Sequence, residues 1–184
     1  KMENFYFFGY GSLLNINTHT YRSHERAYIT GWQRRWSHTI FRNIPYLSVY
    51  PVVGGKIHGL VALVPNNDWK ALDVRETGYK RKYTKCTVGS KSNNNTQLYY
   101  VPTTNLTKKD TNKGILLSYL DCVIQGYLHQ FGEEVAAEFF TSTDGWDICV
   151  TDDRLQPIYP RSVNLTTSER VFVDHHLLKI QKSL

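Results

Sequence analysis

The sequence has no apolar run that approaches the roughly 20 residues a helix needs to cross a bilayer. The apolar stretch after Lys1–Asn4 is short and is interrupted by Gly9, so we expect no signal peptide. Cysteines are few and far apart, at Cys86, Cys122 and Cys149. Their spacing fits neither a disulfide framework nor a CxxC metal site, and it predicts a cytoplasmic protein with reduced thiols.

The sequence also lacks internal repeats, blocks of like charge and a linker between domains. Its 184 residues predict a single domain, residues 1–184, and 41% hydrophobic residues predict a packed core rather than disorder. Lys and Arg total 22 against 16 Asp and Glu, which gives a formal net charge of +6. This excess permits an anionic partner but does not select one.

Aromatic residues are frequent, at 14%, which favours strands and lined cavities. The first half of the sequence predicts strands, at residues 5–8, 27–39, 47–50, 56–64, 79–88 and 96–101. The second of these is expected to bend at Gly31. A short helix is predicted over residues 68–75 with Asp68 as its N-cap, and the polar segment 89–96 is predicted to be a hairpin loop.

The second half predicts helices. Apolar residues between Gly114 and Phe131 recur at the three-and-four spacing of an amphipathic helix. A second helix is predicted from Gly132 to about Phe140, with acidic residues in its first turn. Strands first and helices later favour an α+β fold with a closed or strongly curved sheet.

A loop with two glycines, Phe8–Leu14 (FGYGSLL), directly follows the first predicted strand. Glycine permits a tight turn and lets a ligand approach the backbone closely. Successive N–H groups in such a turn can bind a carboxylate or a phosphate. The segment fits neither the GxxxxGK[ST] loop nor the GxGxxG fingerprint. An ordinary turn at a strand end is the commoner origin of the pattern.

Glu76 lies where the predicted short helix ends. Side chains at the ends of elements can be directed into a cavity. Apolar surroundings disfavour the ionised carboxylate, and so raise its pKa towards the range of a general base. Four neighbouring cations leave two interpretations open: they oppose that shift and attract an anionic substrate, or they form an ordinary solvated edge. They are Arg75, Lys80, Arg81 and Lys82. A solvated glutamate paired with a neighbouring cation is the alternative.

Tyr119 lies on the long predicted helix, two turns before Tyr127. Most tyrosines on the apolar face of a helix are core residues whose hydroxyl has a partner. Tyr119 therefore gains a functional role only if its hydroxyl reaches the same cavity as Glu76. Other chemistry is weakly supported: Ser12 lacks a GxSxG context, and the adjacent His175 and His176 do not have the spacing of a zinc site.

Three segments, taken together, resemble the gamma-glutamylcyclotransferase-like family. Residues 8–14 are similar to its YGS loop. Residues 72–76 (LDVRE) followed by 79–81 (YKR) are similar to its LDxxE and YxR signature at a helix end. Residues 118–126 are similar to a family helix that contains a tyrosine and a glycine. The three segments occur in the family's order, which is more specific than any one of them.

The resemblance implies an α+β fold, a small mixed β-barrel flanked by helices with a cavity at one end. The family-like core covers about residues 5–142, and the C-terminal tail 143–184 lies outside it.

The resemblance also implies an activity, because family members typically release 5-oxoproline from gamma-glutamyl compounds without a metal or cofactor. The α-amine of the glutamyl group must lose a proton to attack its own γ-carbonyl, so one carboxylate base suffices. By resemblance, Glu76 is that catalytic base and later returns the proton to the leaving amine. The residues implied to bind the substrate are Tyr10, Gly11, Ser12, Leu13 and Tyr119.

Two other classes of function stay open. The first is a non-catalytic module on the same fold that binds a small acid or has a regulatory role, although a pure anion binder gains nothing from a carboxylate in its pocket. The second is nucleic-acid binding, which requires a continuous basic face that the short, dispersed basic clusters do not suggest. We therefore expect a small gamma-glutamyl substrate and neither nucleic acid nor membrane as a partner. The identity of the leaving amine and the oligomeric state are left open.

Overall fold

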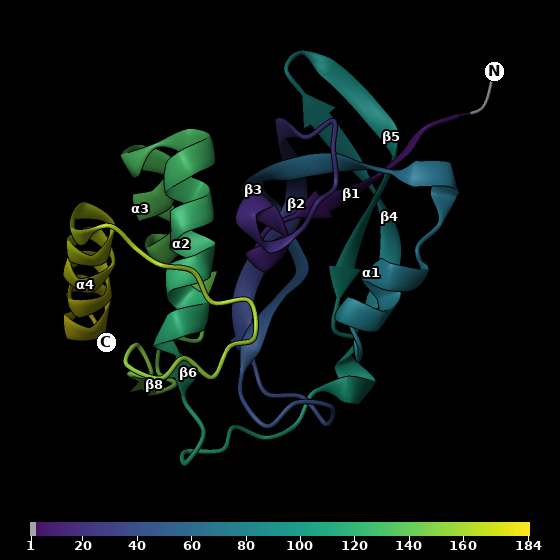
Figure 1. The fold of residues 1–184 in the computed structure, drawn as a ribbon. Coiled ribbons are helices and arrows are strands. Elements are labelled where there is room, and N and C mark those ends of the chain that lie inside the picture. The colour runs from purple at the N-terminus through teal and green to yellow at the C-terminus, as the bar shows by residue number, and fades with distance from the viewer. Residues whose placement is uncertain (1–2) are drawn as a thin grey trace.

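A closed β-barrel forms the first half of the protein (Figure 1). The computed structural model describes residues 3–184, so that Lys1 and Met2 lie outside the described residues. The barrel strands are β1 (Phe5–Gly9), β2 (Glu25–Ser37), β3 (Tyr46–Val64), β4 (Lys80–Val88) and β5 (Lys91–Tyr100). Their order is β3-β1-β5-β4-β2, and pairing of β2 with β3 closes the barrel. Strands β1 and β5 pair in parallel, whereas all other pairs among these five strands are antiparallel. The expected mixed barrel is therefore confirmed.

The longest strand pair, β2 with β3, bends where the sequence predicts a bend. The register shifts between Thr30 and Trp32, and Gly31 between them has a φ of +84°. Residues 52–55 of β3 lie opposite Gly31 without a paired partner. Strand pairing resumes on both sides of this excursion, so the two strands predicted at 47–50 and 56–64 are in fact one.

The hairpin of β4 and β5 has a shorter loop than the sequence predicts. Only Gly89 and Ser90 form the turn, and the polar residues that follow already pair with β4, with Ser92 opposite Thr87. The predicted loop over residues 89–96 is therefore wrong for most of its length. Hydrogen bonds between the backbones of β4 and β5 form without regard to the kind of side chain, and the polar side chains of an exposed strand can face water.

Helix α1 (Lys70–Arg75) connects β3 to β4 after a short 3-10 turn, η3 (Pro65–Asn67). Its N-cap is Trp69 rather than the predicted Asp68. The carboxylate of Asp68 nevertheless accepts a hydrogen bond from the Lys70 N–H at 3.1 Å. The helix ends at Glu76, so the predicted position of Glu76 at a helix end is confirmed.

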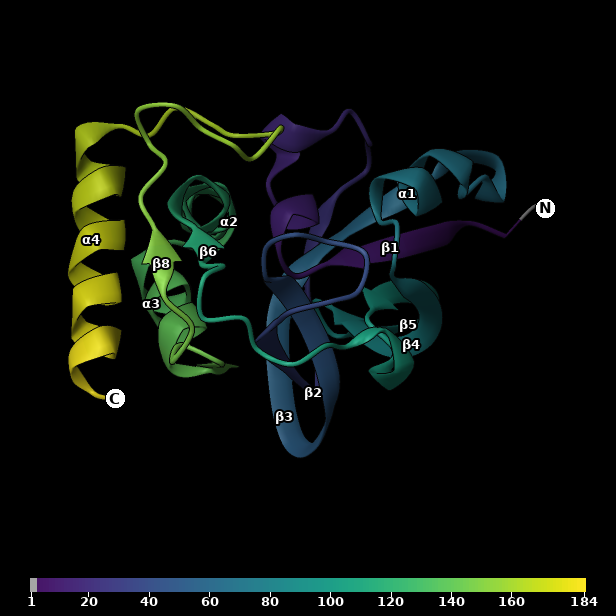
Figure 2. The same ribbon diagram turned by 90° about the horizontal axis from the view of Figure 1, so that it is seen from below.

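Three helices cover one side of the barrel (Figures 1 and 2). They are α2 (Leu117–Phe131), α3 (Glu133–Thr141) and α4 (Thr167–Lys182). Gly132, with a φ of +84°, ends α2 and begins α3, close to the predicted boundary. The structure begins α2 at Leu117, because the two preceding residues form β6 (Ile115–Leu116), which pairs with β8 (Val150–Thr151).

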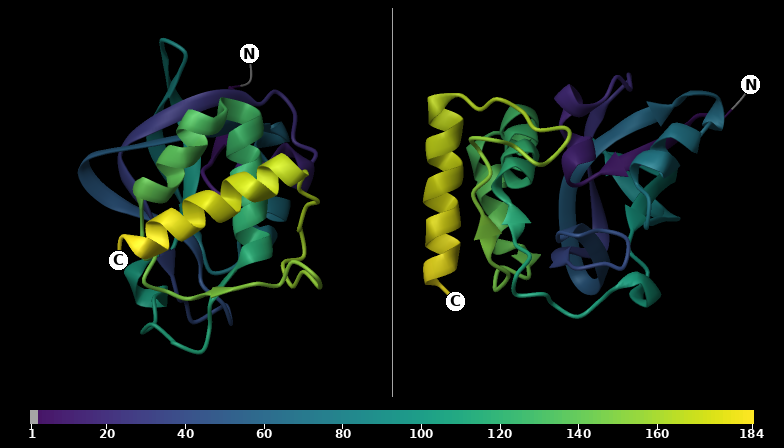
Figure 3. Two further views of the ribbon diagram at one scale, coloured as in Figure 1. Left: turned by 90° about the vertical axis from the view of Figure 1, so that its left-hand side faces the viewer. Right: turned by 60° about the horizontal axis from the view of Figure 1, so that its bottom comes forward.

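Helix α4 crosses over α2 and α3 (Figure 3, left). The sequence analysis missed this helix because its apolar face is narrow: Val173 and Leu177 are its only buried apolar residues. A capping box did mark its start: Thr166 and Glu169 each bind the other's backbone N–H.

The segment between α3 and α4 is tied to the start of α2. Asp153 accepts hydrogen bonds from the Ser118 N–H at 2.8 Å and the Ser118 hydroxyl at 2.5 Å. Arg154 binds both carboxylate oxygens of Asp121 on α2, each at 2.8 Å, and Asp174 on α4 at 2.7 Å. The tail therefore packs on the family-like core.

The cysteines are free thiols, with Cys86 and Cys122 buried and Cys149 exposed. Burial raises the pKa of Cys86 and of Cys122 to about 12, so both stay protonated at neutral pH. None of the helices between residues 3 and 184 is long and apolar enough to cross a membrane.

Candidate active site

A cavity at one end of the barrel contains every residue that the sequence analysis selected. It lies where the end of β1, the end of α1 and the first turn of α2 meet. The selected residues that line it are Tyr10, Gly11, Ser12, Leu13, Glu76 and Tyr119. Phe8, Gly9, Leu47, Tyr79 and Tyr99 complete the lining. The fold thus brings together three segments of the sequence, the first and last of which are more than a hundred residues apart.

Glycine at position 9 is required by the close folding of the loop that follows β1. This loop leads into the 3-10 turn η1 (Ser12–Leu14). A Cβ on Gly9 would lie 2.7 Å from the Leu13 carbonyl carbon and 2.8 Å from the Leu14 nitrogen. A Cβ on Gly11 would lie 3.2 Å from the Tyr119 hydroxyl oxygen. Glycine at position 9 therefore lets the loop fold back on its own backbone, and glycine at position 11 leaves room for the Tyr119 hydroxyl.

The loop leaves a run of N–H groups without protein partners. Its own turns use the Leu14 N–H, which donates to Gly11 O at 3.1 Å, and the Asn15 N–H, which donates to Ser12 O at 3.1 Å. The N–H groups of residues 10–13 donate no hydrogen bond within the described residues 3–184. Such a run of free donors beside a cavity is suited to bind a carboxylate or an oxyanion.

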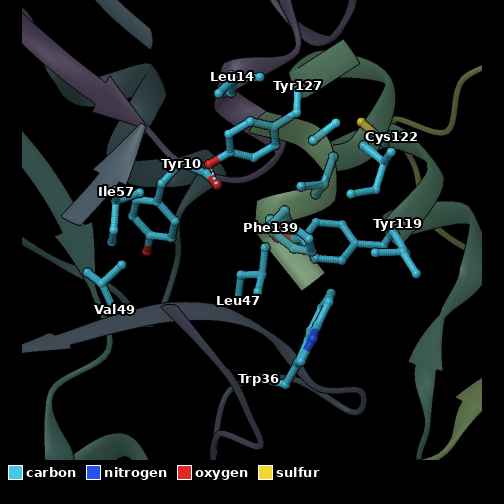
Figure 4. Packing of buried hydrophobic residues seen from close by; sticks show 14 of the residues in the cluster. Tyr10, Leu14, Trp36, Leu47, Val49, Ile57, Tyr119, Cys122, Tyr127 and Phe139 are labelled. Atoms are coloured by element: carbon cyan, nitrogen blue, oxygen red, sulfur yellow. Dashed lines mark hydrogen bonds between the residues drawn. The ribbon is translucent and has the colours of Figure 1, made fainter. Parts of the chain in front are cut away.

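The loop is fixed to the barrel and to α2. The Tyr10 hydroxyl donates to the Tyr99 carbonyl at 2.5 Å. The Tyr127 hydroxyl donates to the Tyr10 carbonyl at 2.9 Å (Figure 4). Asn15 Nδ2 donates to the Cys122 carbonyl on α2 at 2.8 Å. The side chain of Tyr10 is therefore used to hold the fold, which leaves the backbone of this residue to face a ligand.

Close packing against α2 explains another glycine in the family-like pattern. A Cβ on Gly126 would lie 2.8 Å from Leu14 Cδ2 and 3.0 Å from Asn15 Cβ. Glycine at this position lets the helix approach the loop. The side chain of Leu13, in turn, packs in a small core cluster with Phe7 and Trp69, so only its backbone is available to the cavity.

Glu76 has a buried carboxyl group at the end of α1, with a side chain only 15% exposed. Burial raises its pKa, and the positive charges of Arg75, Arg42 and Arg161 oppose this without cancelling it. The carboxylate accepts no hydrogen bond from the described part of the chain, and Arg75 Nε lies 3.5 Å from Oε1. This environment fits a carboxylate that exchanges protons with a ligand.

Of the four cations that flank Glu76 in sequence, only Arg75 lines the cavity region. Arg75 also joins α1 to the loop, because it donates to the Thr18 carbonyl at 3.0 Å and to the Ser12 hydroxyl at 3.3 Å. The other three lie on β4, where Arg81 pairs with Asp73 at 2.9 Å. Of the four cations, only Arg75 opposes the rise in the pKa of Glu76, and the three on β4 are exposed and line neither compartment.

Tyr119 reaches the cavity with its hydroxyl, which lies beside Gly11. Its ring packs edge-on against Tyr46 and Tyr159, with centroid distances of 4.9 Å to each. Burial raises its pKa well above the ordinary value, so the hydroxyl stays protonated and can donate a hydrogen bond. The condition that the sequence analysis set for Tyr119 is met in the geometry.

The sequence analysis missed four residues around Glu76. Arg42, Tyr46, Tyr159 and Arg161 line a second compartment that shares Ser12, Glu76, Tyr79 and Tyr119 with the first. Tyr159 and Arg161 come from the tail, where a Tyr-Pro-Arg segment is visible in the sequence without indicating a place in the fold. Within residues 3–184, no group of three or more His, Cys, Asp or Glu side chains could hold a metal ion.

Solved structures with the same fold include one described as a gamma-glutamyl cyclotransferase. A structure described as a gamma-glutamyl cyclotransferase superposes with a TM-score of 0.63 at 14% identity, covering 94% of this chain and 99% of that one. An uncharacterized protein from Homo sapiens gives a TM-score of 0.64 at 15% identity, with 94% and 99% coverage. YkqA from Bacillus subtilis gives 0.58 at 18% identity, with 78% and 57% coverage. At these identities the likeness establishes the fold alone.

Sequence comparison gives the family. No curated protein sequence matches the chain. The family model described as "Gamma-glutamyl cyclotransferase, AIG2-like" matches residues 7–118, which include the loop after β1 and Glu76 and end one residue before Tyr119. Because that match covers more than half of the sequence, the chain belongs to the AIG2-like gamma-glutamyl cyclotransferase family.

Proposed function

We propose that the protein cyclises the glutamyl group of a gamma-glutamyl compound and releases 5-oxoproline together with an amine or amino acid. The observation that best supports this is a single cavity that combines the free N–H groups of residues 10–13 with the buried carboxyl group of Glu76. A carboxylate is unfavourable in a site that binds only an anion, so its presence in this cavity supports a role in moving a proton.

Glu76 acts as general acid and base in this proposal. Its carboxylate takes a proton from the α-amino group of the glutamyl moiety while that nitrogen attacks the γ-carbonyl carbon. A bond between this nitrogen and carbon forms and closes the five-membered lactam. The amide bond from the γ-carbon to the leaving nitrogen breaks, and Glu76 returns the proton to that nitrogen. Protons and electrons balance without any further reactant.

The loop and Tyr119 hold the substrate for this step. The N–H groups of residues 10–13 bind the α-carboxylate or the oxyanion that develops on the γ-carbonyl. The Tyr119 hydroxyl, beside Gly11, donates a further hydrogen bond. Because both reacting groups belong to one molecule, holding it in its cyclising conformation contributes much of the rate.

The proposal is tested by incubating the purified protein with a panel of gamma-glutamyl dipeptides and gamma-glutamyl amines and measuring 5-oxoproline. We expect turnover of at least one substrate. Binding of these compounds without any turnover would contradict the proposal and favour the non-catalytic module on the same fold.

The activity is expected to fall in acid as Glu76 becomes protonated. Since burial raises the pKa of Glu76, the acid limb of kcat/KM should have its midpoint above the ordinary value of 4.5. The measurement is kcat/KM for 5-oxoproline release between pH 4 and 8, with protein stability followed over the same range. A midpoint at or below 4.5 would argue against a buried carboxyl group as the base.

A further inference from the structure

The second compartment beside Glu76 carries positive charge that the proposed cyclisation does not use. It adds Arg42, Tyr46, Tyr159 and Arg161 to the residues shared with the first cavity. Counting Arg75, three guanidinium groups face one carboxylate, that of Glu76. An anionic group of a ligand would offset this excess of cations.

Two of the three arginines are already used by the fold. Arg75 binds Thr18 and Ser12, as described above. Arg42 donates to the carbonyl oxygens of Arg75 at 3.2 Å and Thr77 at 3.4 Å, and its guanidinium lies 5.0 Å from the centroid of the Tyr46 ring. These contacts hold the end of α1 and the loop after β2 together.

Arg161 differs from both. It is exposed to solvent, and its guanidinium forms neither a hydrogen bond nor an ion pair with any residue between 3 and 184. It is nevertheless near enough to Glu76 to lower the pKa of that carboxyl group. Its backbone is held in place because Ser162 N–H donates to Tyr159 O at 3.1 Å and the Tyr159 ring packs on Tyr119. The backbone of Arg161 is therefore fixed beside the second compartment, and its guanidinium is free to bind an anion.

The position of Glu76 assigns the two compartments to the two halves of the substrate. Glu76 lines both compartments. Residues 10–13 line the first compartment and Arg161 lines the second, so a glutamyl group bound by the N–H groups of residues 10–13 directs the leaving half towards Arg161. Tyr46 and Tyr159 offer aromatic surfaces to an apolar side chain there.

We propose that Arg161 binds a carboxylate of the leaving group, so that the protein prefers gamma-glutamyl amino acids or peptides over uncharged gamma-glutamyl amines. This inference rests on the proposed function. A guanidinium matches the planar carboxylate with two parallel hydrogen bonds, which makes Arg161 a residue that determines specificity. It lies in the tail, outside residues 7–118 that the family model matches.

The test uses two substrates that differ only in this charge, gamma-glutamyl-alanine and gamma-glutamyl-alaninamide. We expect the unmodified protein to prefer the acid. Arg161→Gln should lower kcat/KM for the acid by about 10- to 100-fold more than kcat/KM for the amide, because only the acid loses a charged partner, whereas any change in the pKa of Glu76 affects both substrates equally. The control is Arg26→Gln, which removes the same charge from an exposed position on β2 outside both compartments and should change neither rate.

Two results would overturn the inference: equal rates on the acid and the amide in the unmodified protein, or an equal loss on both in Arg161→Gln. If neither substrate is turned over, the proposed function fails, and calorimetric titration with the same two compounds still decides the role of Arg161. The acid must then bind more tightly than the amide, and only while Arg161 is present. Equal binding would overturn the inference.

Discussion

Replacing Glu76 by Gln is expected to lower kcat for 5-oxoproline release by about 10²- to 10⁴-fold, the usual contribution of a general acid–base group. The amide keeps the size of the side chain but cannot take a proton from the α-amino group. Substrate binding should change less, because the free N–H groups of residues 10–13 and the Tyr119 hydroxyl stay in place. Initial rates at saturating substrate measure this effect.

The Glu76→Gln protein should be as stable as the original or more stable at neutral pH. A carboxyl group whose pKa is raised in the folded protein favours folding while it is protonated, and this contribution is lost as pH rises through the raised pKa. The neutral amide avoids that loss. Urea unfolding at pH 7 measures the difference in the free energy of unfolding between the two proteins. A Glu76→Gln protein that is stable but inactive would show that Glu76 has a chemical role rather than a structural one.

Asp73→Asn is the matched control for Glu76→Gln. Asp73 lies on the same helix, and its carboxylate binds Arg81 and the Tyr99 hydroxyl instead of lining either compartment. We expect this variant to keep its kcat. Full activity in Glu76→Gln would remove Glu76 as the base.

Replacing Arg154 by Met is expected to lower the free energy of unfolding by about 3–5 kcal/mol. Arg154 is the bidentate partner of Asp121, whose side chain is only 6% exposed. Without Arg154, the Asp121 carboxylate is left buried and unpaired, which costs far more than the pair itself contributes. Equilibrium unfolding in urea measures the change.

The double variant Asp121→Leu with Arg154→Met provides the control for this prediction. Removing both charges leaves no buried unpaired group, so the double variant should recover most of the stability that Arg154→Met loses. A loss below about 1 kcal/mol in the single variant would mean that the pair behaves as a surface ion pair. The tail would then be held to α2 mainly by Asp153 and Ser118.

The sequence predicted those structural features that depend on the backbone conformation of a single residue. Gly31 bends β2 because its φ is positive, and Gly132 separates α2 from α3 for the same reason. The sequence did not predict features that depend on pairing with a strand elsewhere in the chain. The strand β3 continues past residues 52–55 because β2 pairs with it on both sides.

The same distinction applies to the candidate site, of which the sequence predicted some residues and missed others. Gly9, Gly11 and Glu76 carry local signals, since glycines mark close approach and Glu76 ends a helix. Arg42 and Arg161 carry none, because each reaches Glu76 only through the closure of the whole fold. The basic run on β4 is close to Glu76 in sequence, but its three residues are exposed and line neither compartment.

The central claim is that the loop after β1, Glu76 and Tyr119 form one site for a gamma-glutamyl group. A crystal structure of the Glu76→Gln protein with gamma-glutamyl-alanine tests it most directly. The claim predicts the α-carboxylate or γ-carbonyl oxygen within hydrogen-bond distance of the N–H groups of residues 10–13, and the α-amino group beside the side chain at position 76. A ligand bound outside this cavity, or with its α-amino group turned away from position 76, would contradict it.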